Sequence, residues 1–149
     1  MKKNFFLIKI LIIYVFLISS AISKQSNYFN KGEELFHEKK FDKSKILFEK
    51  DIVFNPKSVN SYLYLAKIFN EKDNHEEQEI NLNSVLLLNP QNEEAIYMLI
   101  LLKIKKSDYN RAKELIDRFS LVCKSFCSKK EEIQKKLKKL TPEDAKVND

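Results

Sequence analysis

The sequence has 149 residues, a single glycine, two cysteines and a formal net charge of +6. This length favours one domain, and no stretch shows the alternation of polar and apolar residues that is typical of a strand. HExxH, GxSxG and glycine-rich phosphate-loop motifs are absent. We therefore predict an all-α protein that is not an enzyme, with no catalytic residue and no cofactor.

Residues 1–23 have the pattern of a secretory signal peptide. A short basic start precedes an apolar stretch from Phe5 to Ile18, and Ala21 and Ser23 would flank a cleavage site. The alternative is an uncleaved membrane anchor over residues 5–22, since this stretch approaches the ~20 residues that a spanning helix needs. Either interpretation predicts an exported protein, periplasmic or extracellular, or one anchored with its folded part outside the cytoplasm.

Cleavage would also change the charge of the chain. Removing Lys2, Lys3 and Lys9 lowers the net charge from +6 to +3. Proteins that bind nucleic acid usually carry a strongly basic patch, so this weak excess argues against a nucleic-acid partner. Membrane contact is expected only if the N-terminal segment is retained.

The spacing of apolar residues after the N-terminal apolar segment predicts pairs of helices. The first helix is predicted over residues 26–38, and its partner begins after a turn, with Asp42 as the N-cap. Asn55-Pro56 should end this second helix, because proline cannot donate a backbone hydrogen bond and restricts the preceding residue. A second pair follows in the same order and ends at Asn89-Pro90.

A third pair is predicted to begin at Asn92, a favourable N-cap. Ser128 and Glu131 fit a capping box and predict a last helix over residues 128–140, with one narrow apolar stripe and many lysines. The polar tail over residues 141–149 is expected to be disordered.

Cys123 and Cys127 form a candidate disulfide. An even number of cysteines in an exported protein favours pairing. Residues four apart on one continuous helix lie about 6 Å apart at Cα, near the upper limit for a disulfide, and a loop between them would ease this restriction. His37 and His75 are far away in the sequence, so we predict no metal site.

The sequence repeats itself at a fixed interval. Pro56 and Pro90 are 34 residues apart, as are Tyr28 and Tyr62. Gly32 and Ala66, and Phe48 and Leu82, follow the same spacing. A fixed period of this size indicates an architecture of stacked repeats.

These residues resemble the tetratricopeptide (TPR) family, whose repeats are helix-turn-helix units with the same period as this sequence. The resemblance covers three repeats, over residues 25–58, 59–92 and 93–126. It implies an α-solenoid of about three repeats, within residues 24–127, plus a capping helix over residues 128–140. Asp51 departs from the pattern, because an apolar residue is usual there, and Lys124 stands in the place of the closing proline.

The resemblance also implies that the first helices of the pairs line a concave groove that binds peptides or helices. The positions expected to face the groove are Phe29, Glu33, Phe36, Leu63, Lys67, Asn70, Tyr97, Leu101 and Ile104. Some family members grip a C-terminal carboxylate with basic residues, but no basic residue occupies the matching positions here: Phe29, Glu33, Tyr64, Glu94 and Met98. We therefore expect an apolar groove with aromatic anchors, suited to a hydrophobic segment or an amphipathic helix.

Two functional interpretations remain open. The first is a non-enzymatic scaffold or assembly factor of the cell envelope that binds a protein or peptide partner in this groove. The alternative is a structural repeat protein that associates with itself as a homo-oligomer and buries the groove between its copies.

Overall fold

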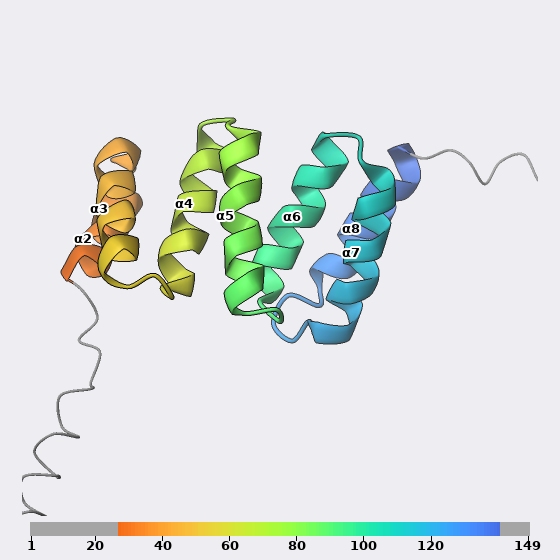
Figure 1. Ribbon diagram of the computed structural model, residues 1–149. Helices are drawn as coiled ribbons and strands as arrows, with labels where there is room; N and C mark the ends of the chain where they lie inside the picture. The colour runs from red at the N-terminus through yellow and green to blue at the C-terminus, as the bar shows by residue number, and fades with distance from the viewer. Residues whose placement is uncertain (1–26, 141–149) are drawn as a thin grey trace, which may run out of the picture.

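The computed structural model describes residues 27–140, and all the regular structure of that part is helical. Its helices are α2 (Asn27–His37), α3 (Phe41–Phe54), α4 (Val59–Glu71), α5 (His75–Leu88), α6 (Glu93–Lys105), α7 (Tyr109–Val122) and α8 (Lys129–Leu140). They form three antiparallel pairs stacked side by side, with α8 against the last pair (Figure 1). The chain is thus an all-α solenoid of three TPR-like repeats closed by a further helix. The predicted signal segment and the tail lie outside the described residues.

The two edges of the stack contain different connections. The lower edge in Figure 1 contains the start of α2, the ends of α3, α5 and α7, and the loops that follow these three helices. The opposite edge contains the tight turns inside each pair. Both Asn-Pro pairs lie on the lower edge, and α3 and α5 end directly before them as predicted.

The tight turns share a conformation that the sequence did not predict. Lys39, Asp73 and Ser107 have positive φ angles of 58°, 58° and 59°, and they occupy the same position in the three repeats. Each is followed by an N–H that donates back to the last turn of the first helix, as in the bond of 2.9 Å from Lys40 N to Leu35 O. This is the usual way to close a helix with a left-handed residue, although glycine is normally found there.

The helix starts were predicted only in part. Asn92 accepts a hydrogen bond of 2.9 Å from the N–H of Ala95, which confirms it as the N-cap of α6. The prediction for Asp42 is wrong, because α3 already begins at Phe41 and Lys40 precedes it without a side-chain cap. Asp42 instead lies in the first turn of α3, where its carboxylate pairs with Lys72 that follows α4.

Close approach of α2 and α3 depends on the single glycine. A methyl group on Gly32 would lie 3.0 Å from Cε1 of Phe48, which is fully buried. The hydroxyl of Ser44 also donates a hydrogen bond of 2.7 Å to the carbonyl of Gly32. Small residues at these two positions therefore let the helices touch.

The junction between the first two repeats contains a buried polar pair. Asp51 of α3 is 1% exposed, and its Oδ2 accepts a hydrogen bond of 2.5 Å from the hydroxyl of Ser61 in α4. Ser58 donates in turn to Ser61 at 3.0 Å. The departure of Asp51 from the apolar pattern is therefore matched by a polar partner on the next helix.

The last helix covers the end of the core. Ile133 and Leu137 of α8 are buried among residues of the second and third repeats, whereas Leu140, the third residue of the predicted stripe, is 44% exposed. The remaining side chains of α8 are mostly charged and exposed. Such a helix buries one apolar stripe and presents a hydrated surface, as a cap must do.

Candidate partner-binding face and disulfide loop

The first helices α2, α4 and α6 together present one surface, which we call the first-helix face. The predicted groove residues on it differ widely in exposure. Phe29, Leu63 and Ile104 are only 6%, 7% and 4% exposed. Glu33, Phe36, Lys67, Tyr97 and Leu101 are half-buried, and Asn70 is exposed. Three of the predicted groove residues therefore belong to the core and offer little surface to a ligand.

Aromatic packing explains why the first repeat offers few free anchors. Tyr64 of α4 stacks on Phe48 with ring centroids 4.9 Å apart and meets Phe36 edge-on at 5.0 Å. Phe29 also contacts Tyr64, at 5.9 Å, and Phe48, at 5.7 Å. These rings pack against one another between α2, α3 and α4, so Phe29 offers little surface as an anchor for a ligand.

Polar contacts link the three first helices across this face. The hydroxyl of Tyr64 donates a hydrogen bond of 2.6 Å to Oε1 of Glu33 on α2. Lys67, one turn further along α4, forms an ion pair of 2.8 Å with Glu94 on α6 and lies 4.9 Å from the centre of the Tyr64 ring. Burial and the neighbouring Glu33 carboxylate raise the pKa of Tyr64 to about 12, so its hydroxyl stays a donor at neutral pH.

Tyr64 was not among the predicted groove residues, although it is central to these contacts. Tyr64 follows Leu63 directly. The position of Leu63 in the repeat led us to expect that Leu63, and not Tyr64, faces the groove. Two sequence signals could have indicated its role: its match to a position of the carboxylate clamp, and the cluster of aromatic residues in the first repeat.

A pocket lies at the end of the first-helix face that is nearest to α8. Its volume is about 310 Å³, close to the lower end of the range for small ligand sites. Its lining residues are Asn70, Gln78, Leu101, Leu102, Lys105 and Lys136. Two of the predicted groove residues, Asn70 and Leu101, therefore line the same pocket as Lys105 of α6 and Lys136 of α8.

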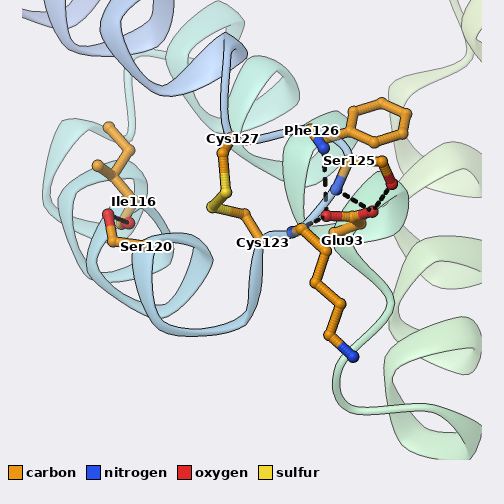
Figure 2. Close-up of a disulfide and its surroundings, with 8 residues drawn as sticks. Glu93, Ile116, Ser120, Cys123, Ser125, Phe126 and Cys127 are labelled. Carbon is orange, nitrogen blue, oxygen red and sulfur yellow. Dashed lines mark hydrogen bonds between the residues drawn. A yellow bond between two sulfur atoms is a disulfide. The ribbon is translucent and has the colours of Figure 1, made fainter.

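Cys123 and Cys127 form a disulfide with Cα atoms 5.2 Å apart (Figure 2). The restriction expected for a continuous helix does not apply, because α7 ends at Val122 and α8 begins only at Lys129. The intervening residues form a loop, which we call the disulfide loop (residues 123–128), on the lower edge of the stack.

The carboxylate of Glu93, at the start of α6, holds this loop (Figure 2). It accepts hydrogen bonds from the N–H groups of Lys124 at 2.5 Å, Ser125 at 3.1 Å and Phe126 at 3.2 Å. The Ser125 hydroxyl donates to it as well. These donors, with the N–H of Lys124 foremost, lower the pKa of Glu93 to about 2.

The described residues contain no arrangement that indicates metal binding. Within residues 27–140, no three side chains of His, Cys, Asp or Glu converge on a point where they could hold an ion. None of the helices from α2 to α8 combines the length and the apolar character that a membrane span requires.

The geometry defines a protein of the TPR-like class, and comparison with solved structures supports this assignment of the fold. The TPR domain of OM64 from Arabidopsis superimposes with a TM-score of 0.68 at 17% identity, over 75% of this chain and 92% of that chain. The TPR2B domain of yeast Sti1, solved as a complex with pHsp70, gives a TM-score of 0.70 at 15% identity, over 77% and 99% of the two chains.

A third similar structure is the type III secretion chaperone SycD of Yersinia enterocolitica, solved with a peptide of the translocator YopD. Its TM-score is 0.68 at 8% identity, over 78% of this chain and 92% of that chain. No family model matches the sequence, and no curated protein matches it either. The similarity at these identities establishes the TPR-like fold.

Proposed function

We propose that this chain is an exported, non-enzymatic interaction protein of the cell envelope, which binds a segment of a partner protein along the first-helix face. The observation that carries the proposal is the pocket at the end of this face. It combines an apolar wall at Leu101 and Leu102 with polar groups from Asn70, Lys105 and Lys136. A pocket with a mostly apolar wall and a few polar groups suits one anchoring side chain of a bound segment.

The remainder of the face suits contact with a peptide backbone. Glu33, Tyr64, Lys67 and Glu94 are half-buried and held by one another, so they are fixed before a partner arrives. Fixed side chains lose little conformational freedom on binding, which favours affinity. Proteins of similar fold support a peptide partner: SycD is seen with a YopD peptide, and the first TPR of Spaghetti (RPAP3) is bound to an HSP90 peptide.

Two features support export to the cell envelope. The N-terminal segment has the basic start and the apolar stretch that are typical of a signal peptide or of a membrane anchor. Cys123 and Cys127 are paired, and stable disulfides form mainly in oxidising compartments such as the periplasm or the extracellular space.

Site-specific photo-crosslinking in intact cells tests the proposal. A photoreactive amino acid at Asn70 should give a discrete crosslinked product, whereas the same amino acid at Lys113, exposed on α7, should not. Leu101→Asp should abolish the product at Asn70, because a carboxylate replaces the apolar wall of the pocket. If the product persists in the Leu101→Asp variant, the first-helix face is not the binding surface.

Self-association through this face is the second candidate, favoured by the half-buried apolar side chains of Tyr97 and Leu101. Sedimentation velocity separates the two candidates. A purified monomer would exclude the homo-oligomer, and a dimer that Leu101→Asp converts to a monomer would support it.

A further inference from the structure

Three aliphatic side chains occupy one repeat position and are almost fully exposed. Val53 of α3 is 75% exposed, Leu87 of α5 is 83% exposed, and Leu121 of α7 is 87% exposed. Each is the residue before the last one of its helix. Single exposed aliphatic residues are ordinary, but the same position in all three repeats produces a row of them.

Aromatic residues extend this row at the end nearest the start of α2. Phe54 is 70% exposed and stacks on Tyr28, which is 36% exposed, with ring centroids 5.6 Å apart. The ends of α3, α5 and α7 and the start of α2 all lie on the lower edge of the stack (Figure 1). We call the five residues Tyr28, Val53, Phe54, Leu87 and Leu121 the apolar edge.

The loops beside the apolar edge carry positive charge and no acidic residue. Residues 55–58, 89–92 and 123–128 contain Lys57 and Lys124 but neither Asp nor Glu. Each turn on the opposite edge contains an acidic residue, Glu38, Asp73 or Asp108, beside at least one lysine.

The acidic residues at the start of α6, on the same lower edge, are already engaged. Glu93 accepts the N–H groups of the disulfide loop, and Glu94 pairs with Lys67 at 2.8 Å. The lower edge thus combines exposed apolar side chains with Lys57 and Lys124, while Glu93 and Glu94 are held by other groups of the protein.

The position of the N-terminal segment indicates what this edge contacts. Only residues 23–26 separate the apolar segment 5–22 from the start of α2 at Asn27. The five steps from residue 22 to residue 27 span at most about 18 Å of extended chain. If the segment is retained in a bilayer, the start of α2 and the apolar edge lie beside the lipid head groups.

We propose that the apolar edge is a docking surface for a lipid bilayer with anionic head groups, reached by the retained apolar segment 5–22. Val53, Leu87 and Leu121 enter the interface, Tyr28 and Phe54 lie at head-group level, and Lys57 and Lys124 contact the phosphates. This surface belongs mainly to the second helices, so it goes beyond the proposed function and leaves the first-helix face free for a partner.

A second copy of the chain is the less favoured occupant of this edge. Two copies meeting edge to edge would bring lysines such as Lys57 and Lys124 near their counterparts, and like charges repel. An anionic bilayer attracts the same lysines, with an effect that weakens as salt screens it.

Fluorescence quenching in lipid vesicles tests the proposal on the full chain. The native cysteines are paired, so Leu87→Cys introduces the thiol that a fluorophore labels, and Ser107→Cys on the opposite edge provides the matched control. Both variants are placed in vesicles of phosphatidylcholine and phosphatidylglycerol. We expect a nitroxide on the lipid chains to quench the label at position 87 severalfold more than the label at position 107, and aqueous iodide to show the reverse order.

Three outcomes would overturn the proposal. Equal quenching at the two positions would show that the edge does not face the bilayer. Shielding from iodide without quenching by the lipid nitroxide, together with crosslinking between two chains at position 87, would show that a second copy covers the edge. A chain that does not float with the vesicles would remove the tether on which the proposal depends. Lys57→Glu combined with Lys124→Glu should reduce the lipid quenching at position 87, and no reduction would exclude the role of the anionic head groups.

Discussion

The buried pair Asp51–Ser61 allows a stability test in which the chain supplies its own control. One repeat further on, Val85 and Ala95 occupy the equivalent junction between the second and third repeats and are both fully buried. The fold therefore accepts either a polar pair or an apolar pair at this junction. Replacing Asp51 by Val and Ser61 by Ala converts the first junction into the second.

The single and double variants should behave very differently. Ser61→Ala removes a hydrogen bond to a buried carboxylate, which should lower the free energy of unfolding by about 1.5–3 kcal/mol. At about 4 °C per kcal/mol for a domain of this size, the melting temperature should fall by about 6–12 °C. The double variant, Asp51→Val with Ser61→Ala, should lie within about 1 kcal/mol of the parent protein, because well-packed apolar residues can replace buried charged groups at little cost.

Chemical denaturation followed by circular dichroism measures these differences, and Ser58→Ala serves as a control. Ser58 donates to Ser61 from a half-buried position, so its loss should cost less than about 1 kcal/mol. The stability of the double variant tests whether the two junctions are equivalent. If it is less stable than Ser61→Ala alone, then the carboxylate does more than satisfy Ser61, and the equivalence of the two junctions is wrong.

Three further predictions concern the turns and the titrating groups. Lys39→Gly should stabilise the protein by about 1 kcal/mol because Lys39 has a φ of 58°, whereas Lys43→Gly within α3 should destabilise it by about as much; thermal unfolding of both variants measures the contrast. The low pKa of Glu93, about 2 against an ordinary 4.5, means that its stabilisation of the disulfide loop is complete above pH 4.5 and is lost as the pH falls towards 2. NMR shifts of the Lys124 amide should follow that loss, and Glu93→Gln should remove its pH dependence; a midpoint near 4.5 would contradict the hydrogen-bonded geometry. Tyr64 should ionise near pH 12, and an ultraviolet titration of Tyr64→Phe should lose the phenol that ionises there; the stability that depends on neutral Tyr64 is present below pH 10 and lost between pH 10 and 12.

The helix order and the ends of α3 and α5 could be predicted because they depend on local chemistry. Pro56 and Pro90 stop the helices that precede them, because proline lacks an N–H donor and disfavours a helical conformation of the residue before it. Asn92 caps α6 through its own side chain. The positive φ angles of Lys39 and Ser107 could not be predicted, because the usual sequence signal for that conformation is glycine. The turns adopt this conformation because the two helices they join pack against each other.

The candidate site was harder to predict, because exposure depends on neighbours from other repeats. Phe36, Asn70 and Ile104 share one repeat position, yet Phe36 is half-buried, Asn70 is exposed and Ile104 is 4% exposed. The repeat period assigns a direction to each side chain, but the packing of α2, α4, α6 and α8 decides how much of it a partner can reach. The contacts of Glu93 with residues 124–126 were invisible for the same reason, since the whole of α6 and α7 separates them in the sequence.

The third repeat shows how a different interaction can replace a local signal. The helices α3, α5 and α7 end at residues 54, 88 and 122, in strict register, although Lys124 stands where the first two repeats have proline. After α7, the disulfide between Cys123 and Cys127 and the carboxylate of Glu93 hold the chain away from the helix axis. The loop then leads into α8, where Ile133 is 1% exposed and packs in the core of the repeats. A covalent bond and a buried stripe thus close the solenoid, and the register of the third repeat does not depend on a proline.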